Sequence, residues 1–167
     1  VFVSRNNFDL LNTLIKNIEN KLFNFVSDYE IIIIDNGSTD IKATQFEELT
    51  SEKGAPNLQI YKLANTVDNF TARWVGFENS IGDVIISFDP FIDGTDSLKI
   101  ITSAFEDDID IVFSRKKYSN SRKSLFRKSI YKAFGKAAKI TAGLNLDSYS
   151  SSLIGINRRV LNYLLQF

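Results

Sequence analysis

The sequence lacks cysteine, histidine and methionine. Without cysteine the chain has no disulfide and no thiolate metal site, which fits a reducing compartment. Without histidine it lacks the commonest general base and zinc ligand, so catalysis would have to use carboxylates, Lys or Arg, hydroxyls or a hard metal ion. The absence of methionine, even at position 1, leads us to expect that the chain is a fragment of a longer protein.

Long hydrophobic runs are also missing. No segment approaches the roughly 20 apolar residues of a membrane span, and we expect neither such a span nor a signal peptide. The 167 residues, of which 44% are hydrophobic, suffice for one well-filled domain. We therefore expect a single cytoplasmic domain over residues 1–167.

The net charge is zero, yet the two parts of the chain differ strongly. Residues 1–114 contain 8 Lys and Arg against 19 Asp and Glu, whereas residues 115–167 contain 12 against 1. Residues 115–139 have no acidic side chain at all. Such an asymmetry indicates two surfaces with different ligands, although a basic run is about as often an ordinary solvated helix face.

The stretch EIIIIDNGSTD at residues 30–40 is the clearest structural signal. Its four consecutive isoleucines predict a central strand of a parallel sheet that is covered on both faces. Asn36, Gly37 and Ser38 are turn residues, after which a helix is expected. Asp35, at the carboxyl end of such a strand, would face the crevice where open α/β sheets bind ligands. The simpler interpretation is an acidic strand-to-helix turn.

Strand and helix patterns alternate along the rest of the chain. Strands are predicted for residues 1–3, 58–63, 83–88, 109–113 and 153–156, and helices for residues 8–25, 41–52, 70–80, 97–105 and 157–165, with a further helical stripe within 115–139. This alternation indicates a three-layer α/β fold with a mostly parallel central sheet.

A second aspartate, Asp89, ends the predicted strand 83–88, and Asp93 follows four residues later. If the strands are parallel, Asp35 and Asp89 reach the same edge of the sheet. Two or three oxygen ligands there, completed by a substrate diphosphate, would hold Mg²⁺ or Mn²⁺. Alternatively, Asp89 and Asp93 are only turn and cap residues around Pro90.

Together these motifs resemble glycosyltransferase family 2. YEIIIIDNGSTD is similar to the family's YEIIVVDDGSTD signature. NFTARWVGFENSIGDVIISFDPFID is similar to the family's asparagine-containing helix, its A-x-GD turn and a strand that ends in Asp-x-Asp. The resemblance covers nearly the whole chain. It implies a Rossmann-like fold of the GT-A type and the transfer of a sugar, with inversion, from a nucleotide-sugar donor.

The resemblance also implies a donor site. Asp35 and Asn36 would contact the nucleoside, Arg73 would lie near the donor, and Asp89 would be the first Asp of the Asp-x-Asp motif. The donor-binding set that it implies is Ser4, Asn6, Asp35, Asn36, Gly37, Arg73 and Asp89.

Two departures from the family pattern concern this site. Phe91 stands where the second Asp, usually a metal ligand, is expected, so Asp89 and Asp93 would together hold any Mg²⁺ or Mn²⁺. Asn6 and Phe8 replace the family's opening Tyr and Glu. A weakened or altered donor site is therefore an open alternative.

The basic segment, residues 115–167, resembles the dolichyl- and polyprenyl-phosphate sugar transferases. Those proteins have a Gly-Ser-Arg strand end, an arginine-rich acceptor segment and later an Asp and an Arg pair. Ile154 stands where one of these arginines is expected. The resemblance implies acceptor binding by Arg115, Arg122, Arg127 and Arg158. The catalytic residues that it implies are Asp89, Asp147 and Arg115.

Acid-base chemistry favours an anionic acceptor. A sugar hydroxyl normally needs a carboxylate base, whereas a lipid phosphate is already ionised. Asp147 is the single carboxylate of the basic part, and neighbouring cations lower a carboxylate's pKa, which makes it a poor base. We therefore expect a polyprenyl-phosphate acceptor, met at the inner face of the membrane, and no nucleic-acid partner. A saccharide acceptor and a non-catalytic module that binds a nucleotide or glycan are the alternatives.

Overall fold

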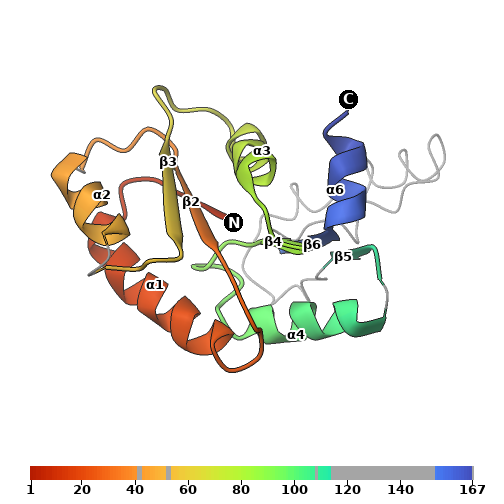
Figure 1. Ribbon diagram of the computed structural model, residues 1–167. Coiled ribbons are helices and arrows are strands. Elements are labelled where there is room, and N and C mark those ends of the chain that lie inside the picture. The colour runs from red at the N-terminus through yellow and green to blue at the C-terminus, as the bar shows by residue number, and fades with distance from the viewer. Residues whose placement is uncertain (41–42, 52–53, 108, 114–152, 167) are drawn as a thin grey trace, which may run out of the picture.

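The computed structural model describes residues 1–40, 43–51, 54–107, 109–113 and 153–166 (Figure 1). Its elements are β1 (Phe2–Ser4), α1 (Phe8–Leu22), β2 (Ile31–Asp35), α2 (Ala43–Thr50), β3 (Leu58–Lys62), α3 (Asn69–Asn79), β4 (Val84–Ser87), α4 (Ser97–Ser103), the 3-10 helix η1 (Ala104–Asp107), β5 (Ile111–Phe113), β6 (Ile154–Asn157) and α6 (Arg158–Leu164).

The first three strands form a parallel sheet with β2 in the middle. In this register Ile33 lies between Phe2 of β1 and Ile60 of β3. Every residue of β2 is buried, as expected for a strand covered on both faces. The predicted central strand is therefore confirmed.

The other three strands pair antiparallel in the order β4-β6-β5. Two backbone hydrogen bonds join them to the first three: the Val1 nitrogen donates to the Ile86 carbonyl at 2.7 Å, and the Phe88 N–H donates to the Val1 carbonyl at 3.2 Å. This pattern is that of parallel neighbours. The described strands thus form one sheet in the order β3-β2-β1-β4-β6-β5, in which β6 alone runs against the others.

Helices cover both faces of this sheet, which gives the predicted three layers (Figure 1). On one face Ile31 and Ile33 pack with Phe2 and the apolar side of α1. Leu98 of α4 belongs to the same core. On the other face Ile32 and Ile34 pack against Ala72 of α3. Alternate side chains of a strand point to opposite faces, so the four isoleucines supply both cores.

Some boundaries differ from the predicted ones. The first helix was expected to reach residue 25, but α1 ends at Leu22, and the side chain of Asn24 donates to the Asn20 carbonyl, one of the last acceptors of the helix. The helical stripe predicted within residues 115–139 lies outside the described residues. In the described part of the chain no helix is long and apolar enough to cross a membrane.

Candidate functional site

The carboxyl edge of the parallel strands brings the two predicted aspartates together. Asp35 is paired with Ser4 at the ends of β2 and β1. The two backbone hydrogen bonds of Val1 place Ser87 of β4 next to Val1. Asp89, two residues later, therefore lies at the same edge of the sheet as Asp35, on the other side of β1. Adjacent strands lie about 4.8 Å apart, which places the two aspartate backbones about 10 Å from each other.

Asp35 combines deep burial with an incomplete set of hydrogen bonds. Its side chain is 1% exposed. Oδ1 accepts the Ser38 N–H at 3.3 Å, whereas Oδ2 is buried and has no hydrogen-bond partner among the described residues. A buried polar atom without a partner is unfavourable, and such atoms are rare in folded proteins. Oδ2 therefore retains an unused hydrogen-bond acceptor at this edge of the sheet.

The turn after Asp35 is held by the loop that precedes α3. The Asn36 amide donates to the Val67 carbonyl at 2.8 Å and accepts the Val67 N–H at 2.9 Å. Gly37 has a φ of +72°, and a Cβ there would lie 2.8 Å from Thr66 Oγ1. Only glycine fits this position without strain. Asn36 and Gly37 thus fix the geometry of the turn that carries Asp35.

The loop after β1 joins the same turn. The Asn6 N–H donates to Ser38 Oγ at 2.8 Å, and the Thr39 N–H donates to Asn6 Oδ1 at 3.0 Å. Ser4 is buried, and its carbonyl accepts the Asn36 N–H at 2.9 Å. The structure therefore brings Ser4 and Asn6 to Asp35. The sequence analysis treated Ser38 as a turn residue and missed that its side chain connects the two loops.

Asp89 and Asp93 belong to one tight turn. The Asp89 N–H donates to Asp93 Oδ2 at 2.8 Å, and the Phe91 N–H donates to Asp89 Oδ1 at 3.0 Å. The side chain of Phe91 is 50% exposed. No group of three or more Asp and Glu side chains that could hold a metal ion occurs among the described residues. The turn therefore offers two neighbouring carboxylates and no third.

Arg158, one of the two predicted arginines that the structure describes, lies elsewhere. Arg158 donates from Nε and Nη2 to the Gly82 carbonyl at 3.0 and 2.6 Å. Gly82 precedes β4, so this contact is at the amino edge of the sheet, opposite Asp35 and Asp89. Burial is the main cause that lowers the pKa of the Val1 ammonium, and Arg73, half-buried on α3, lowers it further. The remaining predicted residues, Arg115, Arg122, Arg127 and Asp147, lie outside the described part.

Glu30, just before β2, is a structural residue that the sequence analysis missed. Its Oε1 accepts the N–H groups of Ile81 and Gly82 at 2.6 and 3.1 Å, and its Oε2 accepts from Gln59 at 3.0 Å. Glu30 and Arg158 thus hold the turn between α3 and β4 from two sides. No local pattern marks Glu30, because its main partners are about 50 residues away in the sequence.

Known proteins are similar to this chain in sequence and in fold. Two relatives are named undecaprenyl-phosphate 4-deoxy-4-formamido-L-arabinose transferase. The Proteus mirabilis protein is 25% identical over 140 residues, 83% of this chain and 42% of that protein. The Pseudomonas fluorescens protein is 26% identical over 161 residues, 96% of this chain and 46% of that protein. The chain thus spans less than half the length of these relatives.

A solved structure has the same fold. It is described as the mannosyltransferase PcManGT from Pyrobaculum calidifontis in complex with GDP-Man and Mn²⁺. The match has a TM-score of 0.56 at 12% identity and covers 98% of this chain and 45% of the other. The fold expected from the resemblance is confirmed. The family described as "Glycosyl transferase family 2" matches residues 1–165, and the chain belongs to that family.

Proposed function

We propose that this chain is the donor-binding and catalytic part of a glycosyltransferase that transfers a sugar from a nucleotide-sugar to a polyprenyl phosphate. The observation that carries the donor site is the buried Oδ2 of Asp35, which lacks a partner among the described residues at the edge where Asp89 also lies. Membership of the family supports the reaction class. The names of the undecaprenyl-phosphate transferases support the acceptor.

In this proposal Asp35 Oδ2 accepts an N–H of the nucleobase. Asn36 and Gly37 hold the turn against the nucleoside, and Ser4 and Asn6 form the neighbouring wall. Asp89 faces the diphosphate and the sugar, and Arg73 contributes positive charge on the α3 side. The hydrogen bonds that join these loops support this arrangement, because they preorganise the site before the donor binds.

The two carboxylates of this site can hold a divalent cation only together with oxygen atoms of the substrate. Mg²⁺ and Mn²⁺ are often held by one or two carboxylates together with substrate phosphates. Asp89 and Asp93 supply two carboxylates in one turn, so the donor diphosphate would complete the set. A metal bound there would neutralise charge that develops on the leaving diphosphate. The solved mannosyltransferase, which contains GDP-Man and Mn²⁺, has this fold.

We assign acceptor binding to the basic segment, residues 115–167. Arg115, Arg122 and Arg127 are proposed to bind the lipid phosphate. An ionised phosphate oxygen attacks the anomeric carbon, the bond from that carbon to the donor diphosphate breaks, and the nucleoside diphosphate leaves. This attack needs no general base. Arg158 is not assigned to the acceptor site, because its guanidinium donates hydrogen bonds to the Gly82 carbonyl at the opposite edge of the sheet. Attraction of the basic segment to anionic lipid headgroups would add peripheral membrane contact.

An assay of sugar transfer tests this proposed function. The protein is incubated with UDP- and GDP-sugars, with Mn²⁺ or EDTA, and with undecaprenyl phosphate or an oligosaccharide as acceptor. We expect a glycosylated lipid product, and less of it with EDTA. Asp89→Asn should abolish turnover, whereas Asp9→Asn, an exposed aspartate of α1, should leave it unchanged. Transfer only to the oligosaccharide would contradict the acceptor assignment.

A non-catalytic module is the second candidate, and the exposed Phe91 at the expected ligand position favours it. Nucleotide binding without any turnover by the protein would establish that alternative.

A further inference from the structure

Three aromatic side chains form a row along one side of α3. The buried ring of Phe77 meets the Trp74 ring edge to face, with the centroids 6.1 Å apart. Trp74 in turn is stacked with Phe70, with the centroids 6.1 Å apart and an angle of 23° between the rings. Residues three and four positions apart share one side of a helix, which explains the row. Its last member, Phe70, is 73% exposed and is nevertheless held in place by a second ring.

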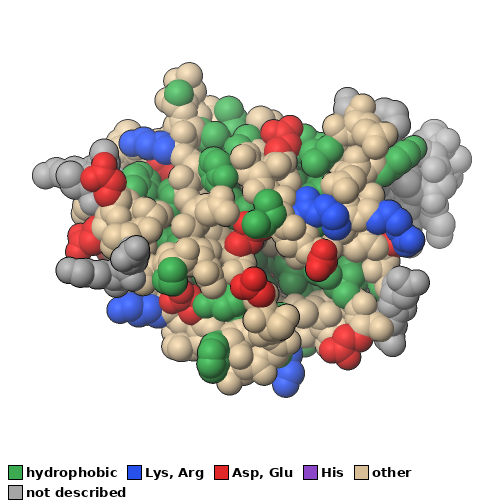
Figure 2. Space-filling model, viewed as in Figure 1, with side chains coloured by type: hydrophobic (Ala, Val, Ile, Leu, Met, Phe, Trp, Pro, Cys, Tyr) green, Lys and Arg blue, Asp and Glu red, His purple; other side chains and the backbone are tan. Residues whose placement is uncertain are grey.

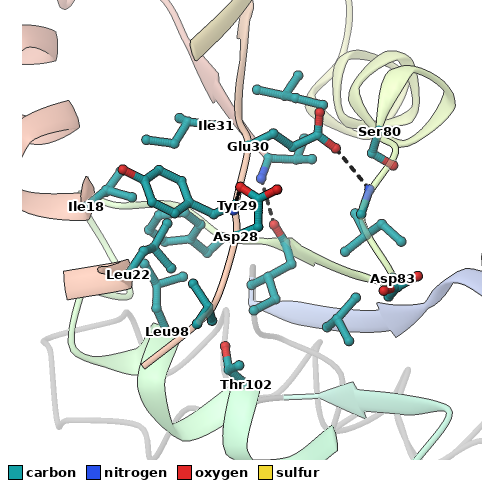
Figure 3. Close-up of a pocket in the computed structure, with 18 of the residues that line it drawn as sticks. Ile18, Leu22, Asp28, Tyr29, Glu30, Ile31, Ser80, Asp83, Leu98 and Thr102 are labelled. Atoms are coloured by element: carbon teal, nitrogen blue, oxygen red, sulfur yellow. Dashed lines mark hydrogen bonds between the residues drawn. The ribbon is translucent and has the colours of Figure 1, made fainter. Parts of the chain in front are cut away.

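The direction of α3 brings this exposed ring to the carboxyl edge of the sheet. The helix begins two residues after Val67, whose backbone is hydrogen-bonded to the Asn36 side chain at that edge. Its other end leads into the turn that Glu30 holds at the amino edge (Figure 3). Phe70, the second residue of α3, therefore lies at the same edge as Asp89.

The row lies on the side of α3 that faces β4. Phe77 and Trp74 belong to one apolar cluster with Ile85 of β4. Hydrophobic side chains are visible at the surface between α3 and α6, on this side of the helix (Figure 2). Toward the carboxyl edge the helix rises about 10 Å from Phe77 to Phe70, and the strand rises about 13 Å from Ile85 to Asp89. Phe70 therefore stands at about the height of Asp89.

Polar side chains surround the exposed ring. Asp68 and Asn69 directly precede Phe70, Asn65 lies in the loop before them, and all three are exposed. An apolar ring bordered by hydrogen-bonding groups matches a sugar, which carries C–H groups on a face of its ring and hydroxyls around it. A lipid chain, in contrast, would leave these polar groups without a hydrogen bond from the ligand. The surroundings of Phe70 therefore favour a sugar as its ligand.

We propose that Phe70 is the stacking surface for the sugar of the nucleotide-sugar donor. The inference rests on the proposed function, in which the nucleobase is at Asp35 and the diphosphate and sugar are at Asp89. The face of an aromatic ring is negatively polarised and attracts the C–H groups of a pyranose ring. Because Trp74 already holds the Phe70 ring, little side-chain freedom is lost when the sugar binds. Phe70 is thus a specificity-determining residue for the sugar, whereas Asp35 contacts the base.

The test separates the sugar from the nucleotide. Calorimetry with Mn²⁺ measures the Kd of UDP, UDP-glucose, UDP-N-acetylglucosamine, GDP and GDP-mannose. We expect Phe70→Ala to weaken the binding of at least one nucleotide-sugar roughly five- to tenfold and to leave its nucleotide within about twofold of the wild type. Phe70→Tyr keeps the ring and should bind as the wild type does. Phe23→Ala is the matched control, because Phe23 is 81% exposed at the end of α1, at the amino edge.

The fluorescence of Trp74 provides a second readout. Trp74 is the only tryptophan of the chain, and it is stacked with Phe70. A nucleotide and its nucleotide-sugar absorb light equally, so a difference between their effects on the emission reports the sugar. We expect the nucleotide-sugar to change the emission of the wild type more than the nucleotide does. This difference should vanish in Phe70→Ala, in which the sugar has lost its stacking partner.

Three outcomes would contradict the inference. If Phe70→Ala kept every ratio of nucleotide-sugar Kd to nucleotide Kd within about twofold of the wild type, the inference would be overturned and the proposed function would stand. Unchanged donor binding by Phe70→Ala together with a raised KM for undecaprenyl phosphate would show that the ring contacts the acceptor instead. If the wild type bound neither UDP nor GDP, the proposed function would be contradicted and the inference with it.

Discussion

Two carboxylates at opposite ends of β2 show how the edges of the sheet differ. Glu30, before the strand, accepts three hydrogen bonds, from Ile81, Gly82 and Gln59. Asp35, at the end of the strand, accepts one long hydrogen bond, and its buried Oδ2 has no partner among the described residues. The satisfied carboxylate holds the turn between α3 and β4, whereas the unsatisfied one is the group that we propose as the hydrogen-bond acceptor for the donor. Our proposal thus assigns a structural role to one end of the strand and a functional role to the other.

The largest expected effect is at the amino edge and concerns Val1. The pKa of its ammonium is lowered from 8.0 to about 5, so between these pH values the unfolded chain binds a proton that the folded chain does not. Stability should therefore fall as the pH falls from 8 to 5, by roughly 4 kcal/mol for a three-unit shift, and this contribution should not change further below pH 5.

Urea unfolding at several pH values measures this. The acetylated chain, which has no N-terminal charge, is the control and should lack most of the dependence. Identical pH profiles for the two proteins would show that the Val1 ammonium is not buried as described.

Glu30→Ala should separate stability from ligand binding. The change leaves two turn N–H groups without their charged acceptor, and we expect a loss of about 2–3 kcal/mol in the free energy of unfolding. Nucleotide affinity should stay within about twofold of the wild type, because the site is at the other edge. Glu30→Gln keeps an acceptor oxygen and should lose less. A stable Glu30→Ala protein with weakened nucleotide binding would reverse the contrast between the two edges.

Gly37→Ala tests the turn at the carboxyl edge. Alanine is strained at a φ of +72°, and its Cβ would meet Thr66 Oγ1 at 2.8 Å. We expect a loss of about 1–2 kcal/mol in stability. Nucleotide affinity should fall as well, since the turn carries Asp35. Gly94→Ala is the comparison for backbone strain alone: it has a similar φ of +73° but no atom within 4 Å of the added Cβ, so it should cost less stability. Nucleotide binding is compared without metal, so that the neighbouring Asp93 does not contribute, and it should stay unchanged in Gly94→Ala.

The sequence predicted the centre of this molecule better than its ends. Ile31–Ile34 carry a local signal, because only a strand buried on both faces tolerates four β-branched apolar residues in a row. Asp35 and Asp89 followed from the same logic, since parallel strands end at one edge. These predictions needed no knowledge of distant contacts.

Arg158 shows what local patterns could not supply. It was assigned to the acceptor by resemblance, but β6 runs antiparallel to β4, which carries the residue after β6 to the amino edge. The direction of a short apolar strand depends on tertiary pairing and leaves no mark in four residues. Glu30 was missed for the same reason, because its role depends on a turn that is distant in sequence and close in space.

The central claim is that the carboxyl end of β2 holds the donor nucleotide through Asp35. The direct measurement is calorimetric titration of UDP and GDP into the wild type, Asp35→Ala and Glu30→Gln, with thermal unfolding to confirm that each protein is folded. We predict that Asp35→Ala stays folded and loses about 1.5–3 kcal/mol of binding free energy, which is roughly 10- to 150-fold in Kd, whereas Glu30→Gln binds as the wild type does. Unchanged nucleotide affinity in a folded Asp35→Ala protein would contradict the account.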